Sequence, residues 1–330
     1  MGLELEIEDS PDREWNARLL SSPLGTIHNT KEYAEYAKRN LKWEPLFVKF
    51  VSKGNVASQL LLFKESKYHR ILKSYSSILP NALLEIGKRI AAQYRWMYGP
   101  VIFDADLRNE VYEKLAELLS HLGKTFVGSI HPLDNEPNPF DRLGFKKELL
   151  GTFVIDLTKE KEKLWLMLDK KSARKNVERA RERKVYVKII EEDDFHVYFK
   201  LLNEHRTSLK VPTFKFDYIY DLWSLLKNIG FTGFITYQGN VPLGGILIST
   251  FNKYLNEWAI ARSIYDEQKY LYAQDLLKWY IIEWGHDEGF RYYDLTGVNP
   301  IPTDKKEIGI FRYKQKWGGT FYSYPIYKKQ

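Results

Sequence analysis

Hydrophobic and polar positions follow two different periods along the chain. Two apolar segments, 46–51 and 57–63, flank Lys53-Gly54-Asn55. Glycine and asparagine tolerate the positive φ angles of tight turns, so this region predicts a β-hairpin. Elsewhere apolar residues recur every three or four positions, which predicts amphipathic helices. These positions are Tyr33, Tyr36 and Ala37, and then Val111, Leu115, Leu118, Leu119 and Leu122.

The hairpin pattern occurs again far downstream. Phe234–Tyr237 and Gly244–Ile248 flank a second Gly-Asn-Val turn that begins at Gly239. A chance recurrence of a common hairpin would explain the turn alone, but each copy also follows a helical pattern and precedes a strand and a helix. With 330 residues to accommodate, we favour two related α/β (α+β) domains, residues 1–150 and 151–330, each a mixed sheet flanked by helices. The segment 152–157 reads as a strand that opens the second domain.

Composition excludes several classes of protein. The chain has no cysteine, so disulfides, cysteine-based zinc sites and thiol nucleophiles are ruled out. No metal is expected, because the seven histidines (28, 69, 121, 131, 196, 205 and 286) form no HExxH pattern. Neither a GxSxG elbow nor a P-loop occurs. No apolar stretch is long enough to span a membrane, and the first residues lack a basic targeting segment, so we expect a cytoplasmic protein.

Positive charge is concentrated in the second half. The net charge is +7, with 21 basic and 20 acidic side chains in residues 1–150 but 29 and 23 in residues 151–330. Between Lys170 and Lys184, eight of fifteen residues are basic. Ala173, Val177 and Ala180 give this segment one apolar helical face. The remaining charge fits either a solvated helix surface or a phosphate-rich partner such as RNA.

Two later segments contain candidates for chemistry. Residues 290–297 follow a helical pattern over 276–288 and read as a buried strand that ends in polar residues and glycine. Strand ends of α/β folds carry reactive groups, so Asp294 is a candidate base or substrate anchor, although helix capping is an equal possibility. In 308–319, aromatic and basic residues alternate, which fits stacking on nucleobases or an ordinary edge strand.

Several segments together resemble the FemABX family, the non-ribosomal peptidyltransferases that use aminoacyl-tRNA, and its BioF2-like acyltransferase relatives. The resemblance covers nearly the whole chain and implies two tandem GNAT-like domains. It is carried by these segments: 25–30, 98–101, 171–180, 276–279, 293–297 and 309–319. In the last of them, Tyr313-Lys314 and Trp317-Gly318 match the Phe-Lys and Phe-Gly of the family's closing pattern.

The resemblance also implies roles for individual residues. Lys314 would stabilise the negative charge that develops during acyl transfer, with Tyr313 beside it, and Asp294 would orient or deprotonate the acceptor amine. The acceptor would lie in a cleft between the domains. By approximate position, the residues that would line that cleft are Lys38, Asp104, Arg206 and Trp258. The basic helix and the loop after it would hold a polyanionic donor through Lys171, Arg174, Lys175, Arg179 and Gln268.

Two departures from the family bear on the donor. The chain is too short for the helical arm of the staphylococcal members, so tRNA contacts by such an arm are not expected. A CoA-binding loop needs a glycine where this chain has Leu271 within Gln268–Ala273, which disfavours CoA. We therefore expect N-acyl transfer from aminoacyl-tRNA to an amine, in the manner of peptidoglycan-bridge enzymes and without a tightly bound cofactor. The alternatives are a CoA-dependent N-acyltransferase acting on a sugar or small amine, and a non-catalytic RNA-binding module.

Overall fold

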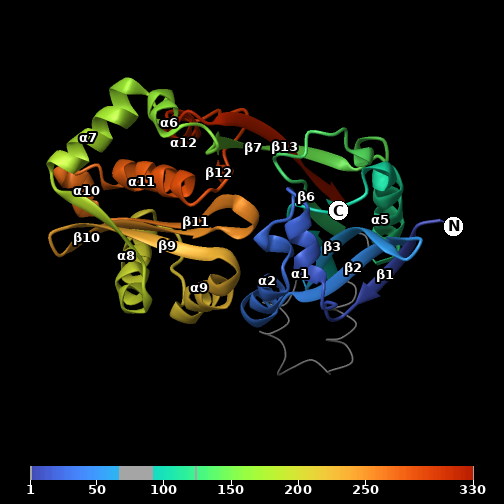
Figure 1. Cartoon of the computed structure of the whole chain (residues 1–330). Coiled ribbons are helices and arrows are strands. Elements are labelled where there is room, and N and C mark those ends of the chain that lie inside the picture. The colour runs from blue at the N-terminus through green and yellow to red at the C-terminus, as the bar shows by residue number, and fades with distance from the viewer. Residues whose placement is uncertain (1, 67–91, 123–124, 330) are drawn as a thin grey trace. The chain divides into compact units, whose positions relative to one another are not determined.

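The computed structural model describes residues 2–66, 92–122 and 125–329 (Figure 1). It contains two compact units. The first comprises Met1–Leu150 with Tyr324–Gln330, and the second comprises Gly151–Ser323.

The last residues of the chain belong to the first unit, whereas the sequence-based division placed them in the second. Strand β13 (Thr320–Lys329) pairs through Ile326–Lys329 with β6 (Thr125–Ser129), which explains this assignment.

The first unit is built on a mixed sheet. β4 and β6 run parallel and the other pairs are antiparallel, with the short β5 (Val101–Ile102) added to β3. In spatial order the strands are β1 (Glu4–Glu8), β2 (Glu44–Ser52), β3 (Asn55–Ser66), β4 (Ala92–Trp96), β6 and the end of β13.

Helices flank both faces of this sheet. Successive side chains of a strand point to opposite faces. Phe47 contacts Trp15 of α1 (Trp15–Ser21) and Phe63 contacts Tyr33 of α2 (Lys31–Tyr36), while Val48 packs in the core with α5 (Arg108–Leu122). Short helical turns complete the unit: η1 (Ile27–Asn29), η2 (Ala37–Leu41), η3 (Ala105–Leu107) and η4 (Pro139–Asp141).

The second unit has its own mixed sheet. β11 and β12 are parallel and the other pairs are antiparallel. In spatial order the strands are β7 (Lys146–Asp156), β12 (Tyr292–Asp294), β11 (Tyr254–Arg262), β10 (Val241–Ser249), β9 (Phe231–Gln238) and β8 (Val185–Ile189).

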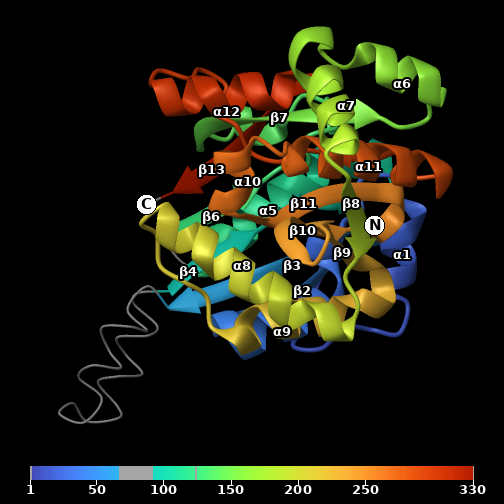
Figure 2. The ribbon, with the colours of Figure 1, turned by 90° about the vertical axis from the view of Figure 1, so that its left-hand side faces the viewer.

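Its helices also cover both faces. Figure 1 shows α11 on one side of β9–β11, and α8 and α9 on the other. Figure 2 shows α7 crossing over α11 toward β8. The helices are α6 (Lys161–Met167), η5 (Lys170–Arg174), α7 (Lys175–Glu182), η6 (Glu192–Asp194), α8 (Phe195–Ser208), α9 (Phe216–Gly230), η7 (Phe251–Lys253), α10 (Ile264–Lys269), α11 (Ala273–Asp287) and α12 (Lys305–Gln315).

The parallel strands of this sheet pair over a short distance only. β12 meets β11 at three positions, of which Asn256 and Asp294 form the last. Beyond that pair β11 continues to Arg262 without β12 beside it. After Asp294 the chain turns away from β11 through Thr296, whose φ of 54° is left-handed, while Leu295 and Val298 still bond to the β7 segment. The sheet therefore opens at the carboxyl end of β12.

Several predictions from the pattern are confirmed. Both hairpins form, as β2–β3 and β9–β10, and their turns use positive φ at Gly54 (78°) and Gly239 (56°). The predicted helices at 111–122 and 276–288 correspond to α5 and α11. Ala173, Val177 and Ala180 are each 0% exposed, as expected for the packed face of the basic segment.

The edge-strand interpretation of residues 308–319 is wrong. Residues 305–315 form α12, and Asp304 caps this helix by accepting the backbone N–H of Glu307 at 2.8 Å. The alternation of aromatic and basic residues resembles a strand, but local capping and the packing of Phe311 against Phe153 favour a helix.

Candidate active site

Asp294 lies at the point where the sheet of the second unit opens, and it is fully buried. One carboxylate oxygen accepts from Thr152 Oγ1 and from the backbone N–H of Thr296 at 2.7 Å. The other accepts from Tyr254 Oη at 2.6 Å and Asn256 Nδ2 at 3.1 Å. Four donors, one from β7, two from β11 and one from the turn after β12, thus hold one carboxylate.

This geometry bears on the predicted role of Asp294. A carboxylate has about four acceptor positions, and the four donors use them. Burial raises the pKa of Asp294 above its ordinary value, while the bonds from Thr152 and Tyr254 and the charge of Lys314 oppose that shift. Direct deprotonation of a substrate amine does not fit a carboxylate with no exposed surface and no free acceptor position. The arrangement fits a group that holds residues 294–297 in place.

Lys314 lies beside the same turn. It projects from the last part of α12, and its Nζ donates to the carbonyl oxygens of Thr296 at 2.8 Å and Gly297 at 3.0 Å. An ammonium has three N–H donors. Among the residues that the structure describes, these carbonyls account for two of them and leave one for another acceptor.

The ammonium of Lys314 is also electrostatically unusual. Burial lowers its pKa to about 8, and the negative charge of Asp294 acts in the opposite direction. A lysine with this pKa is still mainly protonated at neutral pH. Burial removes much of the water that would otherwise solvate its positive charge. Lys314 is therefore suited to stabilise an oxyanion.

Thr296 connects the two groups. Its N–H binds Asp294 and its carbonyl binds Lys314. A β-branched residue with a φ of 54° is rare, because its side chain crowds the backbone there. Such local strain is characteristic of functional sites. The structure thus brings together the carboxylate and the ammonium that the sequence selected, through one turn.

A second buried polar cluster lies where β11 leaves β12. It consists of Glu257, Lys278 and Tyr293, which are 4%, 5% and 0% exposed. Lys278 Nζ pairs with Glu257 Oε1 and donates to Tyr293 Oη at 3.1 Å, and Tyr293 Oη donates to Glu257 at 2.6 Å. Burial, followed by the charges of Lys314 and Lys316, lowers the pKa of Lys278 well below its ordinary value.

Sequence reasoning missed this cluster and the partners of Asp294. No local sequence pattern marks the strand residues of these two clusters as functional, because each lies in an ordinary strand pattern. They are Glu257, Thr152, Tyr254 and Asn256. Lys278 did carry a local signal, because it interrupts the apolar run Leu276–Trp279 of a helix that is buried nearly all round. A lysine in such a place needs a buried partner.

Tyr313 and Lys316 connect α12 to the start of α11. Lys316 Nζ pairs with Asp275 in the first turn of α11 and lies 4.4 Å from the ring centroid of Tyr313. Burial raises the pKa of the Tyr313 hydroxyl, and the nearby Asp275 charge adds to this. Tyr313 therefore stays neutral, and its ring packs against Trp317.

The amino terminus of α11 is closed by acidic groups. Asp266 is 1% exposed, and its Oδ1 accepts the backbone N–H of Ala273 at 3.0 Å. Asp275 follows within the first helical turn. A CoA pyrophosphate would need free N–H groups and positive potential at this helix terminus. Asp266 already takes up the N–H of Ala273, so the doubt raised by Leu271 now has a structural counterpart.

The predicted donor-binding residues lie on η5, α7 and α10 of the same unit. Arg179 Nη1 donates to Tyr272 Oη at 3.2 Å, while Lys171 and Lys175 are exposed. Arg174 is partly buried and Gln268 is exposed at the end of α10.

The four predicted acceptor residues lie in different units. Lys38 lines a hollow of about 380 Å³ in the first unit, and Asp104 caps η3 there through the N–H of Asp106. In the second unit, the Arg206 guanidinium lies 3.9 Å from the ring centroid of Phe214. Trp258 packs edge-on against Phe231. Their role in binding an acceptor stays a prediction.

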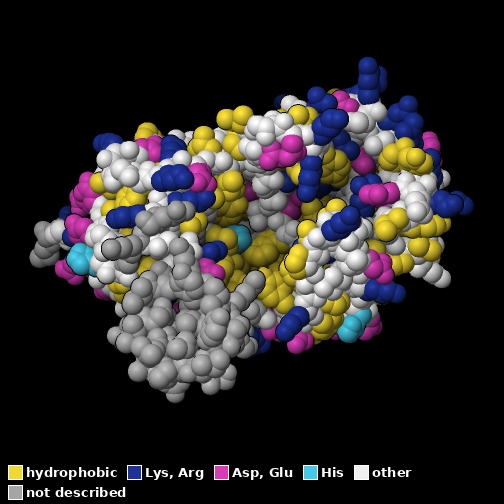
Figure 3. Space-filling view, turned by 180° about the vertical axis from the view of Figure 1, so that it is seen from behind, with side chains coloured by type: hydrophobic (Ala, Val, Ile, Leu, Met, Phe, Trp, Pro, Cys, Tyr) yellow, Lys and Arg dark blue, Asp and Glu magenta, His cyan; other side chains and the backbone are white. Residues whose placement is uncertain are grey.

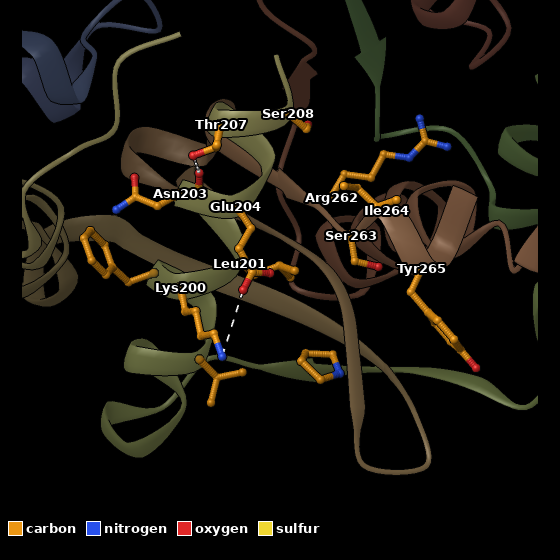
Figure 4. Close-up of a pocket in the computed structure, with 13 residues that line it drawn as sticks. Lys200, Leu201, Asn203, Glu204, Thr207, Ser208, Arg262, Ser263, Ile264 and Tyr265 are labelled. Atoms are coloured by element: carbon orange, nitrogen blue, oxygen red, sulfur yellow. Dashed lines mark hydrogen bonds and ion pairs between the residues drawn. The ribbon is translucent and has the colours of Figure 1, made fainter. Parts of the chain in front are cut away.

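A groove of about 990 Å³ runs along α8 in the second unit, opposite the start of α10 (Figure 4). Its walls are mainly apolar, and its hydroxyls bond locally, as Thr207 does to the carbonyl of Asn203. Lys200 and Glu204 pair across one helical turn at 4.0 Å. The groove is lined by Arg262 and Ser263, at the carboxyl end of β11. This end lies about 20 Å along the strand from Asn256. The groove is therefore separate from the Asp294–Lys314 centre.

No metal site or membrane span was found among the described residues. No group of three or more acidic or histidine side chains there could hold an ion, and His69 lies outside the described part of the chain. None of the described helices combines the length and the hydropathy needed to cross a bilayer.

Comparisons with known proteins identify the fold. No protein-family model and no curated protein matches the sequence. Among solved structures, FemX matches with a TM-score of 0.73 at 13% identity, over 97% of this chain and 96% of that one. L-PGS from Bacillus licheniformis gives 0.59 at 11% identity, over 98% and 94%. A tandem GNAT protein from the clavulanic acid biosynthesis pathway gives 0.55 at 12%, over 99% and 98%.

Proposed function

Since the chain has the tandem GNAT fold that FemX also has, we propose that it is an N-acyltransferase whose reaction centre is Asp294, Thr296 and Lys314. The observation that carries this proposal is the Lys314 ammonium, which is bound by two backbone carbonyls and keeps one N–H, next to a buried carboxylate. At low identity the likeness to FemX, L-PGS and the tandem GNAT protein supports the fold, so the chemistry is argued from these residues.

The proposed reaction is direct transfer. An amine of the acceptor attacks the carbonyl carbon of an activated acyl donor, a C–N bond forms, and the bond to the leaving oxygen or sulfur breaks. The proton lost by the amine balances the one gained by the leaving group. Lys314 donates its remaining N–H to the oxyanion of the tetrahedral intermediate, and Tyr313 keeps the end of α12 packed.

We assign Asp294 a positioning role in this reaction. Its carboxylate fixes the N–H of Thr296, and the carbonyl of the same residue holds Lys314. This positioning role takes the place of the deprotonation of the amine that the resemblance implies for Asp294.

Aminoacyl-tRNA is the donor that we favour over acyl-CoA. The support is the start of α11, where Asp266 occupies the N–H of Ala273 that a pyrophosphate would need. The basic segment 170–184 offers positive charge to a polyanion. The acceptor would be an amine-bearing molecule that Lys38, Asp104, Arg206 and Trp258 help to bind.

Calorimetric titration of the full chain separates the two donors. We expect heat of binding with charged tRNA and none with acetyl-CoA. Saturable binding of acetyl-CoA, followed by acetyl transfer to an aminosugar or small amine, would contradict the donor assignment. Binding of tRNA without acyl transfer to any of a panel of peptide and sugar amines would instead favour an RNA-binding module.

A further inference from the structure

The basic residues of η5 and α7 form a row. Lys171, Lys175, Arg179 and Arg183 occur at every fourth position, so they follow one side of the helical segment at steps of about 6 Å. Such steps are comparable to the separation of successive phosphates along an RNA strand. The opposite side of the segment is buried in the core of the second unit.

The carboxyl-terminal end of this row contacts residues 270–272. Arg179 and Arg183 place their guanidinium carbons 5.5 and 5.1 Å from the ring centroid of Tyr272. Arg183 also donates to the carbonyl of Tyr270. Tyr270 and Tyr272 have φ angles of 52° and 59°, and the side chain of Tyr270 points outward with 66% of its surface exposed. An exposed aromatic ring therefore stands at the end of the basic row.

Much of the charge in this region is uncompensated. In the described part of the chain, Lys170, Lys171, Lys175 and Lys184 have no carboxylate within 4.0 Å, whereas Arg181 pairs with Glu283. Figure 3 shows Lys and Arg side chains gathered at the end of the second unit where α7 lies. Helix stability does not require these lysines, and a polyanion would neutralise them.

We propose that Lys171, Lys175, Arg179, Arg183 and Tyr270, the α7–Tyr270 surface, bind single-stranded RNA. The basic side chains would contact successive phosphates, and a base would stack on Tyr270. A positive track with an exposed aromatic ring is the usual means by which proteins hold single strands without reading their sequence.

An anionic membrane is the competing occupant, and the structure favours RNA over it. A helix that lies on a membrane presents apolar side chains on its exposed side. Here the apolar residues Ala173, Val177 and Ala180 are each 0% exposed, so they are committed to the core. The exposed residues of α7 are all charged: Lys175 and Arg181 are basic, and Glu178 and Glu182 are acidic.

This inference rests on the proposed function in one respect, because we take the bound single-stranded RNA to be the end of the RNA donor. Tyr272 opens α11, Lys316 holds the first turn of that helix through Asp275, and Lys316 lies two residues from Lys314. The surface and the reaction centre are thus joined through short connections within one unit.

Fluorescence anisotropy with a short, labelled, single-stranded RNA tests the surface without requiring catalysis. We expect Tyr270→Ala to weaken binding roughly 5- to 150-fold, the range for loss of one stacked base, and Tyr270→Phe to preserve it. Lys171→Ala/Lys175→Ala should reduce the slope of log affinity against log salt by about 1.4, as expected for two lost phosphate contacts. Tyr270, Lys171 and Lys175 are exposed, so these variants should fold.

Matched controls come from the α8 groove and its neighbourhood. Tyr265→Ala removes an exposed tyrosine, and Lys200→Ala/Lys210→Ala removes two exposed lysines. Both should bind RNA as the wild type does. Failure of the wild type to bind, or equal losses in test and control variants, would overturn the proposal. So would lysine variants that lose binding to phosphatidylglycerol vesicles but keep RNA affinity, because the surface would then be a membrane contact.

The two proposals can fail separately. Normal RNA affinity of Tyr270→Ala in an enzyme that transfers acyl groups would refute the surface alone. RNA binding that depends on Tyr270, in a protein that transfers nothing, would refute the proposed function and support the surface.

Discussion

At the scale of single residues, the site depends on how a few polar groups are kept in unfavourable surroundings. Asp294 remains a buried carboxylate because four donors surround it, and Lys314 remains an ammonium with one N–H available. Each affects the other, since the charge of Asp294 opposes the fall in the pKa of Lys314. Burial thus sets the pKa of Lys314, and a residue that touches no substrate limits the shift.

This coupling predicts the pH dependence of transfer. Lys314 must be protonated to donate to the oxyanion, so the rate should be lost as pH rises through about 8, the value to which burial lowers its pKa. Asp294→Asn removes the charge that opposes this shift, so the descending limb should move to lower pH. The pH profile of kcat/KM measures both effects.

A matched variant identifies the titrating group. Lys314→Arg should have no descending limb near pH 8, whatever its absolute rate, because a guanidinium stays charged. If the limb persists unchanged in Lys314→Arg and in Asp294→Asn, another group is responsible and the assignment of Lys314 is wrong.

At the scale of elements, the site exists because β11 and β12 part after three paired positions. Glu257 and Lys278 fill the opening with an ion pair, and Gly318 lets the chain turn sharply from α12 into β13. A Cβ at Gly318 would approach the Met167 carbonyl to 2.6 Å, and its φ of 77° is one that other residues rarely adopt. These features hold α12, and Lys314 with it, in place.

Replacing Lys278 by Met should destabilise the protein by about 3–5 kcal/mol, because Glu257 is then left as an unpaired buried charge. The double variant Lys278→Met/Glu257→Leu should recover most of that loss. Urea denaturation monitored by tryptophan fluorescence gives the free energies of unfolding. If the single and double variants are equally unstable, the ion pair is not the source of the effect.

The two glycines near the end of the chain should respond oppositely to alanine. Gly318→Ala should destabilise the second unit and lower turnover, since strain there displaces the end of α12. Gly309→Ala should be neutral or stabilising by up to about 1 kcal/mol, because Gly309 lies within α12 with open space around its Cα. Thermal denaturation compares the pair, and equal behaviour would show that the turn at Gly318 carries no such constraint.

At the scale of the whole molecule, two units of one fold differ in charge and in chemistry. The second half of the chain contains the excess of positive charge, the Asp294–Lys314 centre and the α7–Tyr270 surface. The first unit contains Lys38 and Asp104, two of the residues that the family resemblance predicts to bind the acceptor. We propose that donor binding and the chemistry belong to the second unit.

Much of this fold could be predicted from local sequence. The two hairpins and the helices α5 and α11 follow from turn chemistry and periodicity, which act over a few residues. Helix α12 was missed because alternating aromatic and basic residues imitate a strand, and the cap at Asp304 outweighs that pattern.

The candidate site was only half predictable. Asp294 and Lys314 could be selected by motif, but the four donors around Asp294 come from residues as distant as Thr152. Their convergence is a property of sheet order, with β7, β12 and β11 side by side, which no local pattern encodes. The pairing of Glu257 with Lys278 joins β11 to α11 and is likewise not encoded locally, although Lys278 stands out within its apolar run.

The most direct test of the central claim is single-turnover transfer from radiolabelled aminoacyl-tRNA to an amine acceptor, measured for the wild type and for Lys314→Met after both are shown to be folded. Loss of one preorganised oxyanion donor predicts a rate lower by about 10²–10³-fold with tRNA binding retained. A Lys314→Met variant that transfers as fast as the wild type would contradict the account.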